Sequence, residues 1–183
     1  MQNQRTIETL IAGFGGQGVL SAGKVLAFAA LYDGREVSWM PSYGPEQRGG
    51  TANATVIVSA GAISSPIVST FDAAILLSRQ SVSKFAGSVR SGGLLVCDSS
   101  VADAAVARPG VDVLSVDAAA EAEAAGSVRA GCMVMLGVLI GRTRMIDAAR
   151  MAESLRHVLP PRHHDLIDVN MRALRRGMAI AGS

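Results

Sequence analysis

Residues 6–18 read Thr-Ile-Glu-Thr-Leu-Ile-Ala-Gly-Phe-Gly-Gly-Gln-Gly, a β-rich apolar run that ends in closely spaced glycines. The run Thr6–Ala12 predicts a strand, and Val19–Leu31 carries apolar residues densely enough for a buried helix. The glycines between them satisfy the pattern G-x-G-x-x-G directly after a strand and at a helix start, the context that gives this pattern meaning. A strand, a glycine turn and a helix in this order indicate an α/β fold.

The glycine turn is suited to an anionic group. Backbone N–H groups of the first helical turn, with the positive end of the helix macrodipole, can face a phosphate or a carboxylate, and Gln17 offers an amide beside them. A dinucleotide fold also places an acidic residue at the end of its second strand. Here that strand ends in Trp39-Met40-Pro41, and Glu36 lies at its start, so independent binding of NAD or FAD is not favoured. Alternatively, the glycines only let the helix pack tightly on the sheet.

Short apolar runs alternate with helical patterns along the rest of the chain. Further strands are predicted at Glu36–Met40, Thr51–Ser59, Ala73–Ser78, Gly93–Asp98 and Asp112–Val116. Helices are predicted at Gln80–Val89, Ala118–Gly126, Ala130–Arg142, Met145–Leu159 and His163–Gly177, with Pro160-Pro161 separating the last two. This alternation predicts a three-layer, mainly parallel, Rossmann-like sheet with helices on both faces and C-terminal helices, in a single domain over residues 1–183.

A second loop follows the second predicted strand. It reads Tyr-Gly-Pro-Glu-Gln-Arg-Gly-Gly-Thr over Tyr43–Thr51 and holds one acid, one amide and one guanidinium between glycines. Because Pro45 fixes the backbone and the glycines allow close approach, we expect this loop to make contacts with other molecules. An ordinary surface connection is the alternative. Both loops follow strands, so both are expected at the carboxyl edge of the sheet, where open α/β folds bind ligands.

Composition narrows the classes of partner. Apolar residues make up 49% of the chain and charged residues only 17%, which suggests that partner chains cover part of its exterior, unless the composition is simply alanine-rich. A net charge of +2 with scattered arginines argues against nucleic acid. Without a long apolar stretch or a targeting pattern, we expect a cytoplasmic chain and no membrane contact. The two cysteines, Cys97 and Cys132, lie too far apart in sequence to predict an iron–sulfur or zinc site in this chain alone.

Both loops together resemble a known family. The run Gly-x-Gly-Gly-Gln-Gly-Val, the run Met-Pro-Ser-Tyr-Gly-Pro-Glu-Gln-Arg-Gly-Gly-Thr-Ala-Asn and Ser-Pro-Ile at Ser65–Ile67 resemble the gamma subunit of 2-oxoacid:ferredoxin oxidoreductases, most closely the 2-oxoglutarate type. The resemblance continues through Gly92–Leu95 and Gly131–Gly137 and covers most of the chain. Cys132 departs from the asparagine expected in that last segment, which weakens any polar role there.

The resemblance implies a subunit of an enzyme that oxidatively decarboxylates a 2-oxoacid with coenzyme A, giving an acyl-CoA, carbon dioxide and reduced ferredoxin. Thiamine diphosphate would be held by alpha and beta subunits, and iron–sulfur clusters by beta or by a small delta subunit, so no cofactor and no catalytic residue is expected on this chain alone. The alternatives are the beta subunit of indolepyruvate ferredoxin oxidoreductase, whose second loop lacks the Pro-Ser-Tyr-Gly-Pro run, and a free-standing nucleotide-binding regulatory module.

Residues in three segments are predicted to face the substrate, coenzyme A or a partner subunit. They are Gly13, Gly15, Gly16, Gln17, Gly18, Ser42, Tyr43, Gly44, Pro45, Glu46, Gln47, Arg48, Gly49, Gly50, Thr51, Ser65 and Pro66. Arg48 can pair bidentately with a carboxylate or phosphate, and Glu46 either neutralises it or contacts a partner. His157, His163 and His164 are expected to be solvated or capping residues. The identity of the 2-oxoacid, the subunit stoichiometry and dimerisation of the isolated chain stay open.

Overall fold

A computed structural model of the chain describes residues 6–44, 50–102 and 106–182. They form a six-stranded sheet with the order β2-β3-β1-β4-β5-β6. The strands are β1 (Ile7–Phe14), β2 (Glu36–Tyr43), β3 (Thr51–Ser59), β4 (Phe71–Leu76), β5 (Val89–Asp98) and β6 (Asp112–Val116).

Only β3 runs against the other strands. β1 pairs with β4, β4 with β5 and β5 with β6 in parallel, whereas β3 pairs antiparallel with both β1 and β2. The connection from Tyr43 to Thr51 is too short for a crossover, so β2 and β3 pair as a hairpin. The mainly parallel sheet predicted from the sequence is confirmed, and β1 and β2 both end at the same edge, called here the carboxyl edge.

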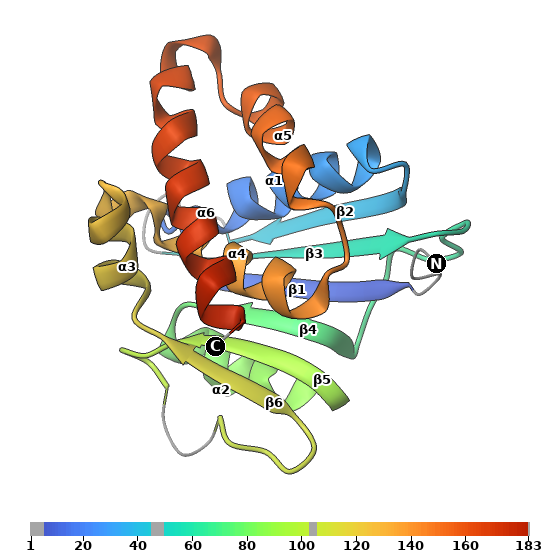
Figure 1. The fold of residues 1–183 in the computed structure, drawn as a ribbon. Helices are drawn as coiled ribbons and strands as arrows, with labels where there is room; N and C mark the ends of the chain where they lie inside the picture. Colours follow the sequence, from blue (N-terminus) through green and yellow to red (C-terminus); the bar gives the residue numbers. More distant parts are fainter. Residues whose placement is uncertain (1–5, 45–49, 103–105, 183) are drawn as a thin grey trace.

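Helices cover both faces of the sheet (Figure 1). They are α1 (Val19–Tyr32), α2 (Arg79–Phe85), α3 (Ala118–Ala125), α4 (Gly131–Thr143), α5 (Met151–Val158) and α6 (Ile167–Ala181). The larger apolar core lies between the sheet and α1, α3, α4, α5 and α6, and a smaller core lies under α2 on the opposite face. The predicted three-layer arrangement is therefore confirmed.

Helix α4 forms the centre of the larger core. All its residues from Cys132 to Ile140 are buried, as expected for a helix that is apolar on every side. It packs against α6 with almost no side chain between the two backbones. A Cβ atom on Gly137 would overlap the carbonyl oxygen of Leu174, and one on Gly177 would overlap that of Val134. These glycines thus set the short distance between the two helices.

Several element boundaries differ from the sequence prediction. β2 extends to Tyr43 through Pro41, which an edge strand tolerates because it has a neighbour on one side only. The crossover helix α2 ends at Phe85, and a 3₁₀ turn over Ala86–Ser88 leads into β5. The two C-terminal helices begin later than predicted, because 3₁₀ turns over Ala148–Arg150 and Pro161–Leu166 precede α5 and α6. Pro160-Pro161 separates the two helices as predicted.

Among the helices of the described ranges, none combines the length and apolarity that crossing a bilayer requires.

Candidate functional site

The glycine turn and the β2–β3 hairpin meet at the carboxyl edge. The backbone N–H of Gly15 donates to the carbonyl oxygen of Gly50 at 2.9 Å, which joins the two segments directly. The N–H of Gly44 donates to the carbonyl oxygen of Thr51 at 3.2 Å, which extends the hairpin past the end of β2. Their meeting confirms the expectation that both loops lie at one edge of the sheet.

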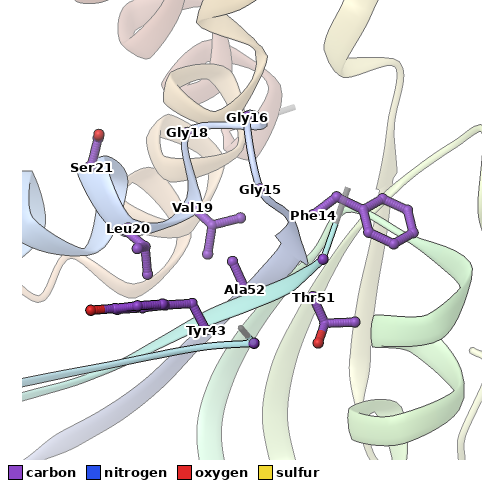
Figure 2. Close-up of a pocket in the computed structure, with 12 residues that line it drawn as sticks. Phe14, Gly15, Gly16, Gly18, Val19, Leu20, Ser21, Tyr43, Thr51 and Ala52 are labelled. Atoms are coloured by element: carbon purple, nitrogen blue, oxygen red, sulfur yellow. The ribbon is translucent and has the colours of Figure 1, made fainter. Parts of the chain in front are cut away.

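A cavity of about 750 Å³ opens between these two segments (Figure 2). Its lining comes from the end of β1, the first turn of α1 and the facing ends of β2 and β3. The lining residues are Phe14, Gly15, Gly16, Gly18, Val19, Leu20, Ser21, Tyr43, Gly44, Gly50, Thr51 and Ala52. A volume of this size falls within the range of small-molecule sites.

The glycine wall of the cavity depends on backbone shapes that other residues rarely adopt. Gly16 has φ +97° and Gly18 has φ +82°, both in the left-handed region. Gly18 is also the N-cap of α1, and no side-chain hydrogen bond caps this helix end. The backbone can therefore approach a docked group without a side chain in between.

The opposite wall is apolar and aromatic. Ala52 and Tyr43 line it from the strands, facing Val19 and Leu20 of α1, and Figure 2 shows the Tyr43 ring lying below Leu20. The Tyr43 side chain is 71% exposed, so it presents a flat ring and a hydroxyl to whatever enters. Serine, threonine and tyrosine hydroxyls are the only polar side-chain groups in the lining that the structure describes, and none of these lining residues is charged.

Gln17 is exposed, is absent from the described lining, and bonds through its amide to the ends of two strands. Its Oε1 accepts the backbone N–H of Phe14 at 2.6 Å, and its Nε2 donates to the carbonyl oxygen of Leu77 at 3.1 Å. Both amide atoms therefore make hydrogen bonds within the chain, between the ends of β1 and β4, and contact of Gln17 with a docked group stays a prediction. Gly13, unlike Gln17, is buried, and it is also absent from the described lining.

The structure separates Ser65 and Pro66 from the two loops. Because β3 runs opposite to β1, the connection from β3 to β4 leaves the sheet at the edge opposite to the carboxyl edge. Both residues are exposed there, and Ser65 Oγ accepts the backbone N–H of Ile67 at 3.1 Å. Contact of these residues with a partner stays a prediction, but they do not belong to the cavity.

The remaining predicted residues divide into two groups. Ser42 is exposed on β2 and lies outside the described lining. The charged centre of the second loop, Pro45, Glu46, Gln47, Arg48 and Gly49, lies outside the described residues. Sequence reasoning missed Phe14, Val19, Leu20, Ser21 and Ala52 as lining residues. They could have been predicted from the sequence because each lies next to one of the two loops, at the end of a predicted strand or at the start of a predicted helix.

The cysteines do not form a reactive or metal-binding site in the described structure. Cys97 belongs to the core under α2, and Cys132 belongs to the core on the other face of the sheet. Burial raises the pKa of Cys132 to about 12, which keeps it a neutral thiol at physiological pH. Within the described ranges, no group of three or more His, Cys, Asp or Glu side chains is placed to hold a metal ion. These residues therefore do not fit an iron–sulfur cluster.

Of the histidines, His164 and His157 have clear structural contacts. His164 Nε2 lies 3.1 Å and 3.0 Å from the carbonyl oxygens of Arg156 and Leu159, at the end of α5. It is a capping residue, as predicted. The ring of His157 lies against Phe28 in a tilted arrangement, with 4.0 Å between ring centroids.

Curated relatives match most of this chain. It is 39% identical over 175 residues to the ketoisovalerate oxidoreductase subunit VorA of Methanothermobacter marburgensis, covering 94% of this chain and 36% of that protein. It is 36% identical over 162 residues to the 2-oxoglutarate synthase subunit KorC of Methanothermobacter thermautotrophicus, covering 84% of this chain and 85% of that protein. The chain thus spans about a third of the length of VorA.

Solved structures share the fold. The gamma subunit of keto/oxoacid ferredoxin oxidoreductase from Geobacter sulfurreducens superimposes with a TM-score of 0.79 at 26% identity, covering 96% of this chain and 98% of that one. The 2-oxoglutarate:ferredoxin oxidoreductase of Magnetococcus marinus, solved with 2-oxoglutarate, coenzyme A and succinyl-CoA bound, superimposes with a TM-score of 0.85 at 23% identity, covering 98% of this chain and 32% of that one. The family description of pyruvate ferredoxin/flavodoxin oxidoreductase matches residues 8–180. With a match of this extent, the chain belongs to the pyruvate ferredoxin/flavodoxin oxidoreductase family.

Proposed function

We propose that this chain is the gamma-type domain of a CoA-dependent 2-oxoacid:ferredoxin oxidoreductase, and that its carboxyl-edge cavity faces the active site formed with partner subunits. The single observation that carries the proposal is the cavity itself, built from the two loops on which the family resemblance rests. The family membership of the chain and its likeness to the Geobacter gamma subunit support the assignment.

Within this proposal, the cavity receives the uncharged part of coenzyme A. The described lining carries hydroxyls, apolar side chains and glycine backbone but no charge, which suits a pantetheine chain better than a phosphate. The CoA phosphates would then need cations from elsewhere. Arg48 in the same loop, or a partner subunit, would supply them. The Magnetococcus enzyme with bound coenzyme A supports the choice of ligand.

Partner subunits complete the enzyme in this proposal. Alpha and beta subunits hold thiamine diphosphate, and the beta subunit or a small delta subunit holds the iron–sulfur clusters, which agrees with the described residues of this chain, none of which form a cluster site. Thiamine diphosphate supplies the carbanion chemistry when bound there, and ferredoxin accepts the electrons. This chain binds and orients coenzyme A, and it helps to exclude water from the shared active site. A cytoplasmic location stays a prediction.

The 2-oxoacid has two candidates. The sequence resemblance favours 2-oxoglutarate, which the name of the KorC relative also supports. The identity to VorA, 39% compared with 36% for KorC, favours the branched-chain acid ketoisovalerate. Purification of the native complex, followed by assays with 2-oxoglutarate, ketoisovalerate and pyruvate, decides between them through the ratio of kcat/KM values.

Substitution of Tyr43 tests the location of the CoA site. In the reconstituted complex, Tyr43→Ala should raise the KM for coenzyme A about tenfold, because the aromatic wall of the cavity is lost, and should leave the KM for the 2-oxoacid unchanged. Leu31→Ala is the matched control, since Leu31 is also an exposed apolar residue, at the far end of α1. An unchanged KM for coenzyme A would exclude the cavity as its site.

The regulatory-module alternative has a separate test. A free-standing module should bind NAD, FAD, ATP or coenzyme A tightly as an isolated chain, whereas a gamma-type domain should bind each weakly without its partners. Calorimetric titration of the isolated chain distinguishes these outcomes.

A further inference from the structure

Gln17 makes the side-chain connection between the glycine turn and the sheet. β1 and β4 pair in parallel up to Ala12 and Leu76, and the N–H of Leu77 still donates to the carbonyl oxygen of Ala12 at 2.9 Å. Beyond that point β1 turns toward α1. The amide of Gln17 fills the place between the diverging ends, accepting from Phe14 N–H and donating to the carbonyl oxygen of Leu77.

In this position the side-chain amide replaces a peptide group. A peptide unit between two strands offers one acceptor and one donor on opposite sides, and the primary amide of glutamine offers the same pair. Residue 17 also donates its own backbone N–H to the carbonyl oxygen of Phe14 at 3.2 Å. The turn from Phe14 to Gln17 is therefore closed by both the backbone and the side chain of one residue.

Gly13 provides the space for this amide. A Cβ atom at Gly13 would lie 2.5 Å from Gln17 Oε1 and 3.1 Å from the Cβ of Leu77. The first separation is shorter than real Cβ atoms show and the second is tight, so a side chain at Gly13 would displace the amide. The first glycine of the motif therefore makes room for Gln17, and Gly13 itself is absent from the described cavity lining.

The connection extends to the second loop. Phe14, which donates to Gln17, is followed by Gly15, whose N–H donates to the carbonyl oxygen of Gly50 at 2.9 Å. The chain of hydrogen bonds thus runs from the end of β4, through Gln17, to both sides of the cavity. Loss of the amide should therefore make the glycine wall more mobile and should also weaken the hydrogen bond that joins this wall to the hairpin.

We propose that Gln17 is a positioning residue that holds the glycine wall of the cavity in its binding shape before any ligand arrives. Its use in catalysis rests on the function proposed above, but its positioning role concerns the isolated chain alone. A preformed wall lowers the entropic cost of binding, so removal of the amide should weaken binding and leave the chemical step largely unchanged.

Amide hydrogen exchange of the full chain, followed by NMR, tests the positioning role. Gln17→Met keeps the length of the side chain and removes both hydrogen bonds, and the exchange of the Phe14 and Gly15 amides should become about tenfold faster. Gln80→Met is the matched control, because Gln80 is exposed on α2, away from the cavity. Unchanged exchange in Gln17→Met would overturn the proposal.

Gly13→Ala is a second way to break the two hydrogen bonds of the Gln17 side chain. It leaves Gln17 in place but moves its amide, so it should accelerate exchange at the same two amides. Because both substitutions remove the same hydrogen bonds, the double variant should exchange no faster than the faster single variant. Additive effects of the two substitutions would contradict the coupling between Gly13 and Gln17.

The enzymatic readout separates this inference from the proposed function. In the reconstituted complex, Gln17→Met should raise the KM for coenzyme A five- to tenfold with kcat changed less than twofold, and Gln80→Met should change neither. Faster exchange with an unchanged KM for coenzyme A would overturn the assignment of the cavity to coenzyme A and support the positioning of the turn. A fall in kcat alone would overturn a role limited to positioning for binding.

Discussion

Glycines are essential in two regions of this molecule for different physical reasons. In the glycine turn, Gly16 has φ +97° and no atom within 4 Å of the place where a Cβ would stand. In the α4–α6 contact, Gly137 and Gly177 have ordinary helical backbones, and a Cβ on either would overlap the facing helix. The turn needs a backbone conformation, whereas the helix contact needs the absence of a side chain.

This difference separates a region open to ligands from one that only supports the fold. The turn leaves free space beside its backbone, and the cavity occupies that space. At the helix contact no such space exists, because the backbone of one helix fills it. Four substitutions test the comparison, beginning with the largest expected effect.

Gly177→Ala should cause the largest loss of stability. The added methyl group would overlap the carbonyl oxygen of Val134, so α4 and α6 must move apart within a close-packed core. We expect the free energy of unfolding to fall by about 3 kcal/mol or more, measured by urea denaturation. Gly87→Ala is the control, since no atom lies within 4 Å of its added Cβ, and it should be neutral. A loss below about 1 kcal/mol in Gly177→Ala would contradict the close contact.

Cys132 lies where the two regions meet, at the start of α4 and 3.5 Å from a Cβ built on Gly18. Its folded pKa is about 12, compared with an ordinary value of 9.0, so the unfolded chain loses this proton first as the pH rises. The stability contribution is therefore complete below pH 9 and declines between pH 9 and pH 12.

At pH 10 the wild type should have lost on the order of 1 kcal/mol of this contribution relative to pH 7. Cys132→Ala, measured over the same pH range, should lack that component of the slope, and the difference between the two curves isolates the thiol. Parallel curves for the two proteins would show that Cys132 is not a buried neutral thiol.

Gly16→Ala should cost about 1 kcal/mol, because an L-residue is strained at positive φ even where space is free. Gly16→Asn should cost less, since asparagine tolerates the left-handed region. Thermal unfolding of both variants measures the order. If the asparagine variant were the less stable of the two, crowding and not backbone conformation would govern this position.

Tyr43→Ala should have the smallest effect on stability, below about 0.5 kcal/mol, because the side chain is already 71% exposed. Its effect should fall on the KM for coenzyme A, as proposed above. Urea denaturation of the isolated chain checks the first expectation. A large loss of stability would mean that the ring supports the hairpin and is not held for contact.

Patterns within a few neighbouring residues were reliable guides. The strand, glycine turn and helix over residues 6–31 follow from local periodicity, and β3 and β6 have the predicted bounds. Helix starts after a 3₁₀ turn were placed too early, because a 3₁₀ turn and an α-helix share nearly the same apolar spacing. The two loops were correctly expected at one edge of the sheet.

The sequence by itself determined the alternation of strands and helices, the mainly parallel sheet and the meeting of both loops, because these depend on local periodicity and on short connections. Only the tertiary structure decided the use of Gln17, whose partner Leu77 is 60 residues away. It also showed that Ser65 and Pro66 lie at the edge of the sheet opposite to the carboxyl edge, since the reversed direction of β3 follows from pairing between strands. Contacts between distant residues arise only when the whole sheet has assembled, and no local pattern encodes them.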